Sequence, residues 1–224
     1  MTILGKNIKI TSIILLFLSL SLSSCFDIIH DVTVKENGSG NLGLTVNLSK
    51  SKSQISKILS LDSIQGFNIP NIKEIDQKLA HLKSELSKVE GISNINITKD
   101  FENYIFKLNF DFKHLDNLNE AQVRLSKASN KSIQPISYSY SEKEFLINYT
   151  KDLLKKFDNE LVKYKLDQLK SADFITICRF DRQVKSCDAM TCKVSKNGQT
   201  TFNKISTSEF IENQRNQSLQ IIFK

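Results

Sequence analysis

The amino-acid sequence predicts an α+β fold, a largely antiparallel sheet built from β-hairpins and covered by amphipathic helices. Three observations carry this prediction. Apolar and polar residues alternate over several short stretches, and these stretches come in pairs joined by turn residues. Segments with apolar residues at every third or fourth position lie between the pairs. Regular alternation of single strands with helices is lacking, which disfavours a doubly wound parallel sheet.

The first predicted hairpin pairs residues 28–35 with residues 41–48. Ile28, His30, Val32 and Val34 alternate with more polar neighbours, and Leu42, Leu44, Val46 and Leu48 do the same after the turn. The turn, residues 36–40, reads Glu-Asn-Gly-Ser-Gly, and an Asn-Gly pair between two such runs is typical of a hairpin. A phosphate-binding loop is the alternative, but no helix start and no Lys-Ser or Lys-Thr pair follows it.

Two helices are predicted next. Residues 49–61 form a short one, and Asn71 with Glu74 forms a capping box that opens a stronger one. Gly91 is expected to end this second helix. Its apolar stripe, which we expect to lie on the sheet, consists of Ile72, Ile75, Leu79, Leu82, Leu86 and Val89.

A second hairpin is predicted over residues 92–97 and 101–113. The second of these strands has the clearest alternation in the chain and is expected in the middle of the core. Its inward residues are predicted to be Tyr104, Phe106, Leu108, Phe110 and Phe112. Asn117 and Glu120 are expected to open a helix that turns Leu118, Ala121, Leu125 and Ala128 inward.

The remaining elements are predicted from the same patterns. A third hairpin covers residues 136–140 and 145–149, and a long helix with a solvated lysine-rich face follows from Thr150 or Asp152 to Lys170. Residues 174–180 are predicted to form a strand buried on both faces. The tail then holds a hairpin over 194–202 turning at Asn197-Gly198, a short helix capped by Ser206 and Glu209, and a last strand over 219–223.

The N-terminus has the order of a secretory signal. Lys6 and Lys9 precede an apolar run over residues 10–22, and small residues lead to Cys25. Residues 22–25, Leu-Ser-Ser-Cys, resemble the bacterial lipobox, in which signal peptidase II cuts before a cysteine that carries lipid. The resemblance implies a signal peptide over 1–24, cleavage between Ser24 and Cys25, and lipidation of Cys25. An uncleaved anchor is disfavoured because a spanning helix needs about 20 apolar residues.

The same resemblance implies where the mature chain works. Residues 25–224 would form a single α+β domain of the bacterial envelope, held to a membrane through its N-terminal lipid on the periplasmic or surface side. Loss of residues 1–24 lowers the formal charge from +7 to +5, because Lys6 and Lys9 leave with them. This mild, dispersed charge suits anionic head groups. It does not indicate nucleic acid, which requires a clustered basic face.

Three cysteines remain after Cys25, so at most one internal disulfide can form. All three pairings of Cys178, Cys187 and Cys192 are open. The pair Cys187–Cys192 is favoured because these residues flank a four-residue loop, whereas Cys178 lies in an apolar strand. A metal site is not expected, because no histidine lies near them and zinc needs a fourth ligand.

The motifs of common catalytic sites are lacking. His30, His81 and His114 fall on separate elements without a His or Cys partner at metal or catalytic spacing, and no Gly-x-Ser-x-Gly motif occurs. We therefore predict a protein without catalytic residues or cofactors. A hydrolase with a dispersed site is kept as an alternative.

Parts of the chain resemble LppM-type bacterial lipoprotein domains. The resemblance is carried by the early cysteine and hairpin with Asn37-Gly38-Ser39-Gly40, by a strand ending in Val184-Lys185, and by the turn at residues 197–201, Asn-Gly-Gln-Thr-Thr, before a short helix and final strand. It implies an envelope domain that holds lipid-like ligands.

Two further hypotheses follow from the residues. The first is an apolar ligand between sheet and helices, against Phe106, Phe110, Phe112, Tyr138 and Tyr140, with simple core packing of these aromatics as its alternative. The second is a structural or assembly role with another envelope protein as the partner.

Overall fold

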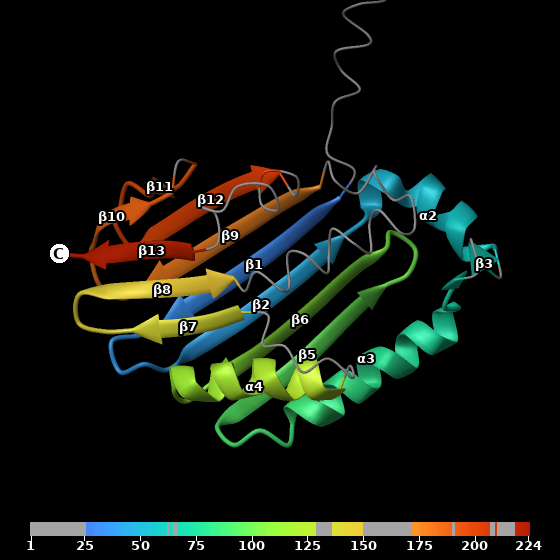
Figure 1. Cartoon of the computed structure of the whole chain (residues 1–224), viewed down its shortest axis with the longest axis horizontal. Helices are drawn as coiled ribbons and strands as arrows, with labels where there is room; N and C mark the ends of the chain where they lie inside the picture. Colours follow the sequence, from blue (N-terminus) through green and yellow to red (C-terminus); the bar gives the residue numbers. More distant parts are fainter. Residues whose placement is uncertain are drawn as a thin grey trace, which may run out of the picture.

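The computed structural model describes residues 26–61, 63–64, 67–128, 136–149, 172–189, 191–206, 209 and 218–224. Over these residues the chain is α+β, as the sequence predicts. It forms a seven-stranded sheet, a four-stranded sheet and a separate two-stranded hairpin, with helices beside them (Figure 1). The predicted helix over residues 152–170 and the helix after Ser206 lie outside the described residues.

The helical elements are η1 (Ser49–Ser51), α2 (Lys52–Leu59), α3 (Ile72–Leu86) and α4 (Leu115–Ala128). The strands are β1 (Asp27–Val34), β2 (Gly40–Asn47), β3 (Ser63–Ile64), β4 (Phe67–Asn68), β5 (Ile92–Asp100), β6 (Ile105–Phe112), β7 (Ile136–Tyr140), β8 (Glu144–Tyr149), β9 (Asp173–Phe180), β10 (Val184–Asp188), β11 (Lys193–Val194), β12 (Thr200–Ser206) and β13 (Ser218–Phe223).

The large sheet has the order β11-β12-β9-β1-β2-β6-β5, and the small one has the order β10-β13-β8-β7. Most neighbours are antiparallel, which confirms the predicted hairpins. The central pair β1 and β9 is parallel, however, with Asp27 opposite Asp173 and Val34 opposite Phe180. This pair brings the first strand of the domain together with a strand about 145 residues later in the chain, in the interior of the sheet.

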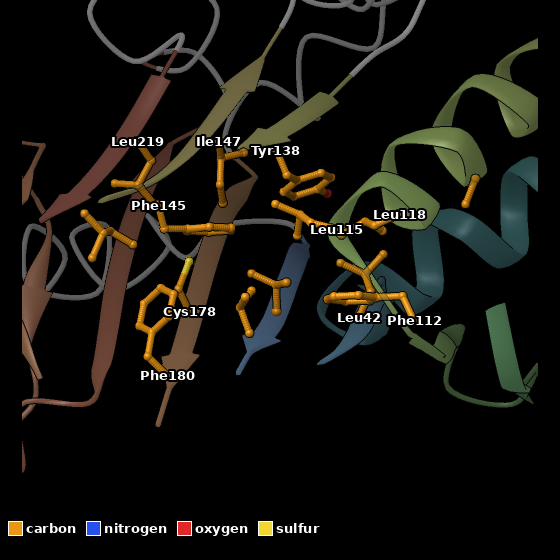
Figure 2. Packing of buried hydrophobic residues seen from close by; sticks show 14 of the residues in the cluster. Leu42, Phe112, Leu115, Leu118, Tyr138, Phe145, Ile147, Cys178, Phe180 and Leu219 are labelled. Atoms are coloured by element: carbon orange, nitrogen blue, oxygen red, sulfur yellow. The ribbon is translucent and has the colours of Figure 1, made fainter. Parts of the chain in front are cut away.

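The core lies between the inner face of the large sheet and a second layer made by the small sheet and α4 (Figure 2). Phe180 of the large sheet meets Phe145 and Phe223 of the small sheet edge to face, with ring centroids 5.4 and 4.9 Å apart. Leu118 of α4 lies near Leu42 and Phe112 of the large sheet. Burying side chains of this size contributes about 1.5–3 kcal/mol each before conformational entropy is counted.

The β5–β6 hairpin differs from its prediction in position and burial. β5 runs on to Asp100, and Tyr104, predicted to be an inward strand residue, lies in the turn with φ +54°. β6 is second from the edge of the sheet, so it is not in the middle of the core. Its last two inward aromatics, Phe110 and Phe112, are buried, whereas Phe106 and Leu108 are only half-buried.

The helices also depart from prediction at their ends. The capping box of Asn71 and Glu74 opens α3, but the helix ends at Leu86, and Gly91 with φ +77° closes the following turn. The start of the apolar stripe is uncovered, since Ile72 is 50% exposed. α4 begins at Leu115, because the side chain of Asn117 accepts a hydrogen bond from the backbone N–H of His114 at 2.9 Å.

Three predictions in strands and loops need correction. β9, predicted to be buried on both faces, is buried only on the inner face of the large sheet. On the outer face Arg179 is exposed. Val184 begins β10 and does not end a strand. Between the two helices predicted over 49–61 and from Asn71, where no strand is predicted, the chain forms the hairpin of β3 and β4.

Candidate functional site

The inner face of the large sheet changes from buried to half-buried along its strands. The cross-strand neighbours Val32, Leu42 and Phe110 are buried under the second layer. Two residues nearer the start of β1, His30 is still buried, but its neighbours Leu44 and Leu108 are half-buried. At the next row, Ile28, Val46 and Phe106 are all half-buried.

We call the half-buried part the open apolar face. It consists of Ile28, Leu44, Val46, Phe106 and Leu108 on three adjacent strands. Strand spacing of about 4.8 Å makes this surface about 10 Å wide across β1, β2 and β6. Period-2 alternation identifies these residues as inward-facing, but it does not tell which of them a second layer covers.

The chain enters the fold at the same end of the sheet. Phe26 is buried, and its backbone carbonyl accepts a hydrogen bond from the N–H of Asp173 at 3.0 Å. Phe26, the residue after Cys25, is therefore already fixed to the sheet. Cys25 and Ser24 themselves lie outside the described residues. No helix in the described ranges is long and apolar enough to cross a membrane.

α2 is held beside this end by the turn between β5 and β6. The hydroxyl groups of Ser56 and Tyr104 form a hydrogen bond of 2.9 Å, and Lys52 pairs with Glu102 at 4.0 Å. In the same turn the ring of Phe101 packs edge-on against Phe106, 5.4 Å between centroids. α2 and the turn thus form one border of the open apolar face (Figure 1).

The five aromatic residues predicted to line an apolar ligand site differ in their burial and contacts. Phe110, Phe112 and Tyr138 are buried members of the core, so the packing interpretation holds for them. Tyr140 is half-buried and packs against Phe223, 5.8 Å between ring centroids. Phe106 alone among the five lies on the open apolar face.

A small polar cluster crosses the interface between the two sheets. His30 Nε2 lies 2.8 Å from the Tyr138 hydroxyl oxygen, and the Tyr149 hydroxyl lies 3.1 Å from Oγ1 of Thr176. His30 and Thr176 are neighbours on the parallel pair β1 and β9. The alternation of β1 places His30 on the inner face but does not identify its partner, because Tyr138 is distant in the chain.

The electrostatics of this cluster favour neutral side chains. Burial lowers the pKa of His30 to about 4, and burial raises the pKa of Tyr138 well above its ordinary value. The ring of His30 is therefore neutral near pH 7, and its hydrogen bond goes to a phenol. This arrangement stabilises the interface between the sheets, but it supplies neither a charged base nor a ready acid.

The cysteines occupy two environments. Cys187 and Cys192 are joined by a disulfide with 6.1 Å between their Cα atoms, and Cys178 is free and buried. Burial raises the pKa of the Cys178 thiol to about 12, which makes the nucleophilic thiolate scarce at neutral pH. Among the described residues, no group of three or more His, Cys, Asp or Glu side chains is placed to hold a metal ion.

The outer face of the large sheet carries an open polar depression of about 530 Å³ centred on Gly43. A Cβ atom at Gly43 would lie 2.9 Å from Oδ1 of Asn109, so a larger residue at this position would crowd Asn109 and fill part of the depression. Asp31 and Arg179 form an ion pair within it. The depression was not foreseen from the sequence, in which Gly43 is only an interruption of an alternating strand.

Comparison with known proteins yields one distant structural match. No family model matches the chain, and no curated protein matches its sequence. Among solved structures, the chain is similar to the folded domain of the Mycobacterium tuberculosis protein LppM, with a TM-score of 0.43 and 10% identity over 89% of this chain and 91% of that one. At this level the match establishes neither a shared family nor a shared function.

Proposed function

We propose that this protein is a lipid-anchored, non-enzymatic component of the bacterial envelope that holds an apolar, lipid-like ligand on its open apolar face. The observation that carries the proposal is the half-buried part of the inner sheet face, which the described part of the second layer does not bury. Ile28, Val46 and Phe106 continue the same strands that bury Val32, Leu42 and Phe110, yet they are only half-buried.

The chemistry of this surface suits an acyl chain. Its members are aliphatic or aromatic, and each square ångström of apolar surface removed from water contributes about 25 cal/mol. The five side chains lie on three adjacent strands, so the apolar surface is continuous, as a binding site for an acyl chain requires. At its border, Lys52 and Glu102 pair with each other at 4.0 Å.

The position of the surface also supports the proposal. Phe26 is bonded to the sheet through Asp173, so a lipidated Cys25 would place the domain within one or two residues of the membrane, with the open apolar face at that end. Such a short tether would keep the open apolar face close to the membrane lipids.

Binding of the fluorescent fatty acid cis-parinaric acid tests the proposal. We expect saturable binding to the wild-type protein and at least a severalfold weaker affinity in Val46→Glu, because the carboxylate would stand on the apolar face. Thr45→Glu is the matched control, since Thr45 is the half-buried neighbour on the opposite face of β2. Equal binding by both variants would overturn the proposed site.

A further inference from the structure

The connection between α2 and α3 carries exposed apolar residues. Leu61, just after α2, is 48% exposed, and Ile72, the first residue of α3, is 50% exposed. Between them β3 and β4 form a two-stranded hairpin that belongs to neither main sheet. The hairpin pairs Ile64 with Phe67. We call Leu61, β3, β4 and Ile72 the projecting hairpin; it stands at the margin of the molecule in Figure 1.

The apolar stripe of α3 leads out of the core to the projecting hairpin. Ile72 belongs to this stripe, whose other end is buried at Leu86. The described elements leave about half of the Leu61 and Ile72 side chains open to solvent. Large apolar side chains exposed at one margin of a molecule usually mark a contact with another apolar phase.

The charges around the projecting hairpin indicate that the apolar phase it contacts is a membrane. Residues 50–74 contain four lysines and two acids, Asp62 and Glu74. Lys50 and Lys52 pair with Asp27 and Glu102. Lys57 and Lys73, on the two sides of the projecting hairpin, are exposed. Apolar residues flanked by lysines are typical of segments that sit in the interface of an anionic bilayer, where the lysines are attracted to the head groups.

The chain leads from the anchored end of the sheet out to this surface. β2 ends at Asn47, opposite Asp27 at the start of β1, and η1 and α2 lead directly from there to the projecting hairpin. We infer that the projecting hairpin inserts into the interfacial region of an anionic membrane and is a second attachment point beside the lipid on Cys25. The inference rests on the proposed lipid anchor for its orientation.

Depth-dependent fluorescence quenching tests this inference on the full processed chain. Ser63→Cys places a probe in β3, and Ser93→Cys places the same probe on β5; both serines are exposed. Labelling of the folded protein with an NBD reagent should be selective, because Cys178 is buried and the other two cysteines of the domain are bonded. The labelled protein is incorporated into vesicles of phosphatidylethanolamine and phosphatidylglycerol that contain a doxyl-labelled lipid.

We expect quenching at residue 63 to be severalfold stronger than at residue 93. Leu61→Glu with Ile72→Glu should abolish this difference. Val194→Glu with Phe202→Glu should leave it intact, because Val194 and Phe202 are comparably exposed, at 39% and 40%, but lie on β11 and β12. Equal quenching at residues 63 and 93 in the unsubstituted background would overturn the inference.

Two further readouts test the anchor and the exposure of the projecting hairpin separately. Retention of the protein on vesicles after a high-salt wash, with the mass of the lipidated N-terminus, reports the anchor independently of quenching. Loss of retention with preserved quenching would therefore contradict the anchor and support the projecting hairpin. A blue-shifted emission at residue 63 without vesicles would show that protein covers this surface and would overturn the inference.

Discussion

The side-chain amide of Asn119 on α4 binds the backbone of Tyr138 on β7 twice. It donates to the Tyr138 carbonyl at 2.9 Å and accepts from the Tyr138 N–H at 2.9 Å. β7 is the edge strand of the small sheet, so this amide completes the hydrogen bonding that a further strand would supply. The contact also ties α4 to the strand that carries the hydrogen-bond partner of His30.

We expect Asn119→Leu to destabilise the protein by about 1–3 kcal/mol, because two backbone groups of a half-buried strand lose their partners. Urea unfolding followed by circular dichroism measures this as a lower midpoint with an unchanged slope. Asn96→Leu, on an exposed position of β5, is the control and should change the free energy of unfolding by less than about 0.5 kcal/mol. Equal midpoints for the two variants would show that the amide contact contributes nothing.

The buried His30 predicts a loss of stability in mild acid. Burial lowers its pKa from 6.5 to about 4, so between these pH values the unfolded chain binds a proton that the folded chain does not. The free energy of unfolding therefore falls as the pH drops from 6.5 to 4. This one group should account for roughly 3 kcal/mol of the change.

Unfolding measured across that pH range in His30→Gln tests the assignment. Glutamine retains a hydrogen-bonding side chain toward Tyr138 but does not titrate, so the dependence on pH should become shallower. His81→Gln, an exposed position on α3, should keep the wild-type dependence. An unchanged dependence in His30→Gln would mean that other groups cause the acid sensitivity.

The three cysteines of the domain should react in a fixed order. With iodoacetamide at pH 8, we expect no labelling of Cys178 in the folded protein, one labelled thiol after unfolding without reductant, and three after reduction. Peptide mass mapping should find Cys187 joined to Cys192. Reduction removes a short loop closure, which should cost about 2 kcal/mol. Three reactive thiols in the native, unreduced protein would contradict both the bridge and the burial.

The anchor has its own test. Cys25→Ser should abolish lipid attachment and leave the uncleaved precursor, because the serine hydroxyl cannot replace the thiol at the lipobox position. In Triton X-114 phase separation, the wild-type protein should partition into the detergent phase and the variant should do so less completely. Mass spectrometry should show residues 1–24 retained in the variant. Identical N-terminal masses for wild type and variant would contradict the lipobox interpretation.

Local patterns predicted the local parts of this fold well. The hairpin of β1 and β2 was predicted because alternation and an Asn-Gly turn are both encoded within a short stretch; Gly38 has φ +78° in that turn. The capping box of Asn71 and Glu74 was predicted for the same reason. These features depend on neighbours in the chain and need no knowledge of the rest of the molecule.

Features that depend on distant neighbours were missed. The pairing of β1 with β9 joins segments on opposite sides of the domain's sequence, and alternation in either strand does not specify its partner. Phe106 and Phe110 follow one pattern on one strand, yet only Phe110 is fully buried. The open apolar face and the Asn119–Tyr138 contact both arise from the placement of a second layer, which single-strand patterns do not encode.

The parallel pairing of β1 and β9 has a consequence for the order of folding. Because the chain emerges N-terminus first, β1 and β2 are available long before β9. Until residues 173–180 are made, β1 is an unpaired edge with Ile28, Val32 and Val34 on one side, open to strands of other chains. A chain that stops before Asp173 would keep that edge for its lifetime and should accumulate as aggregates.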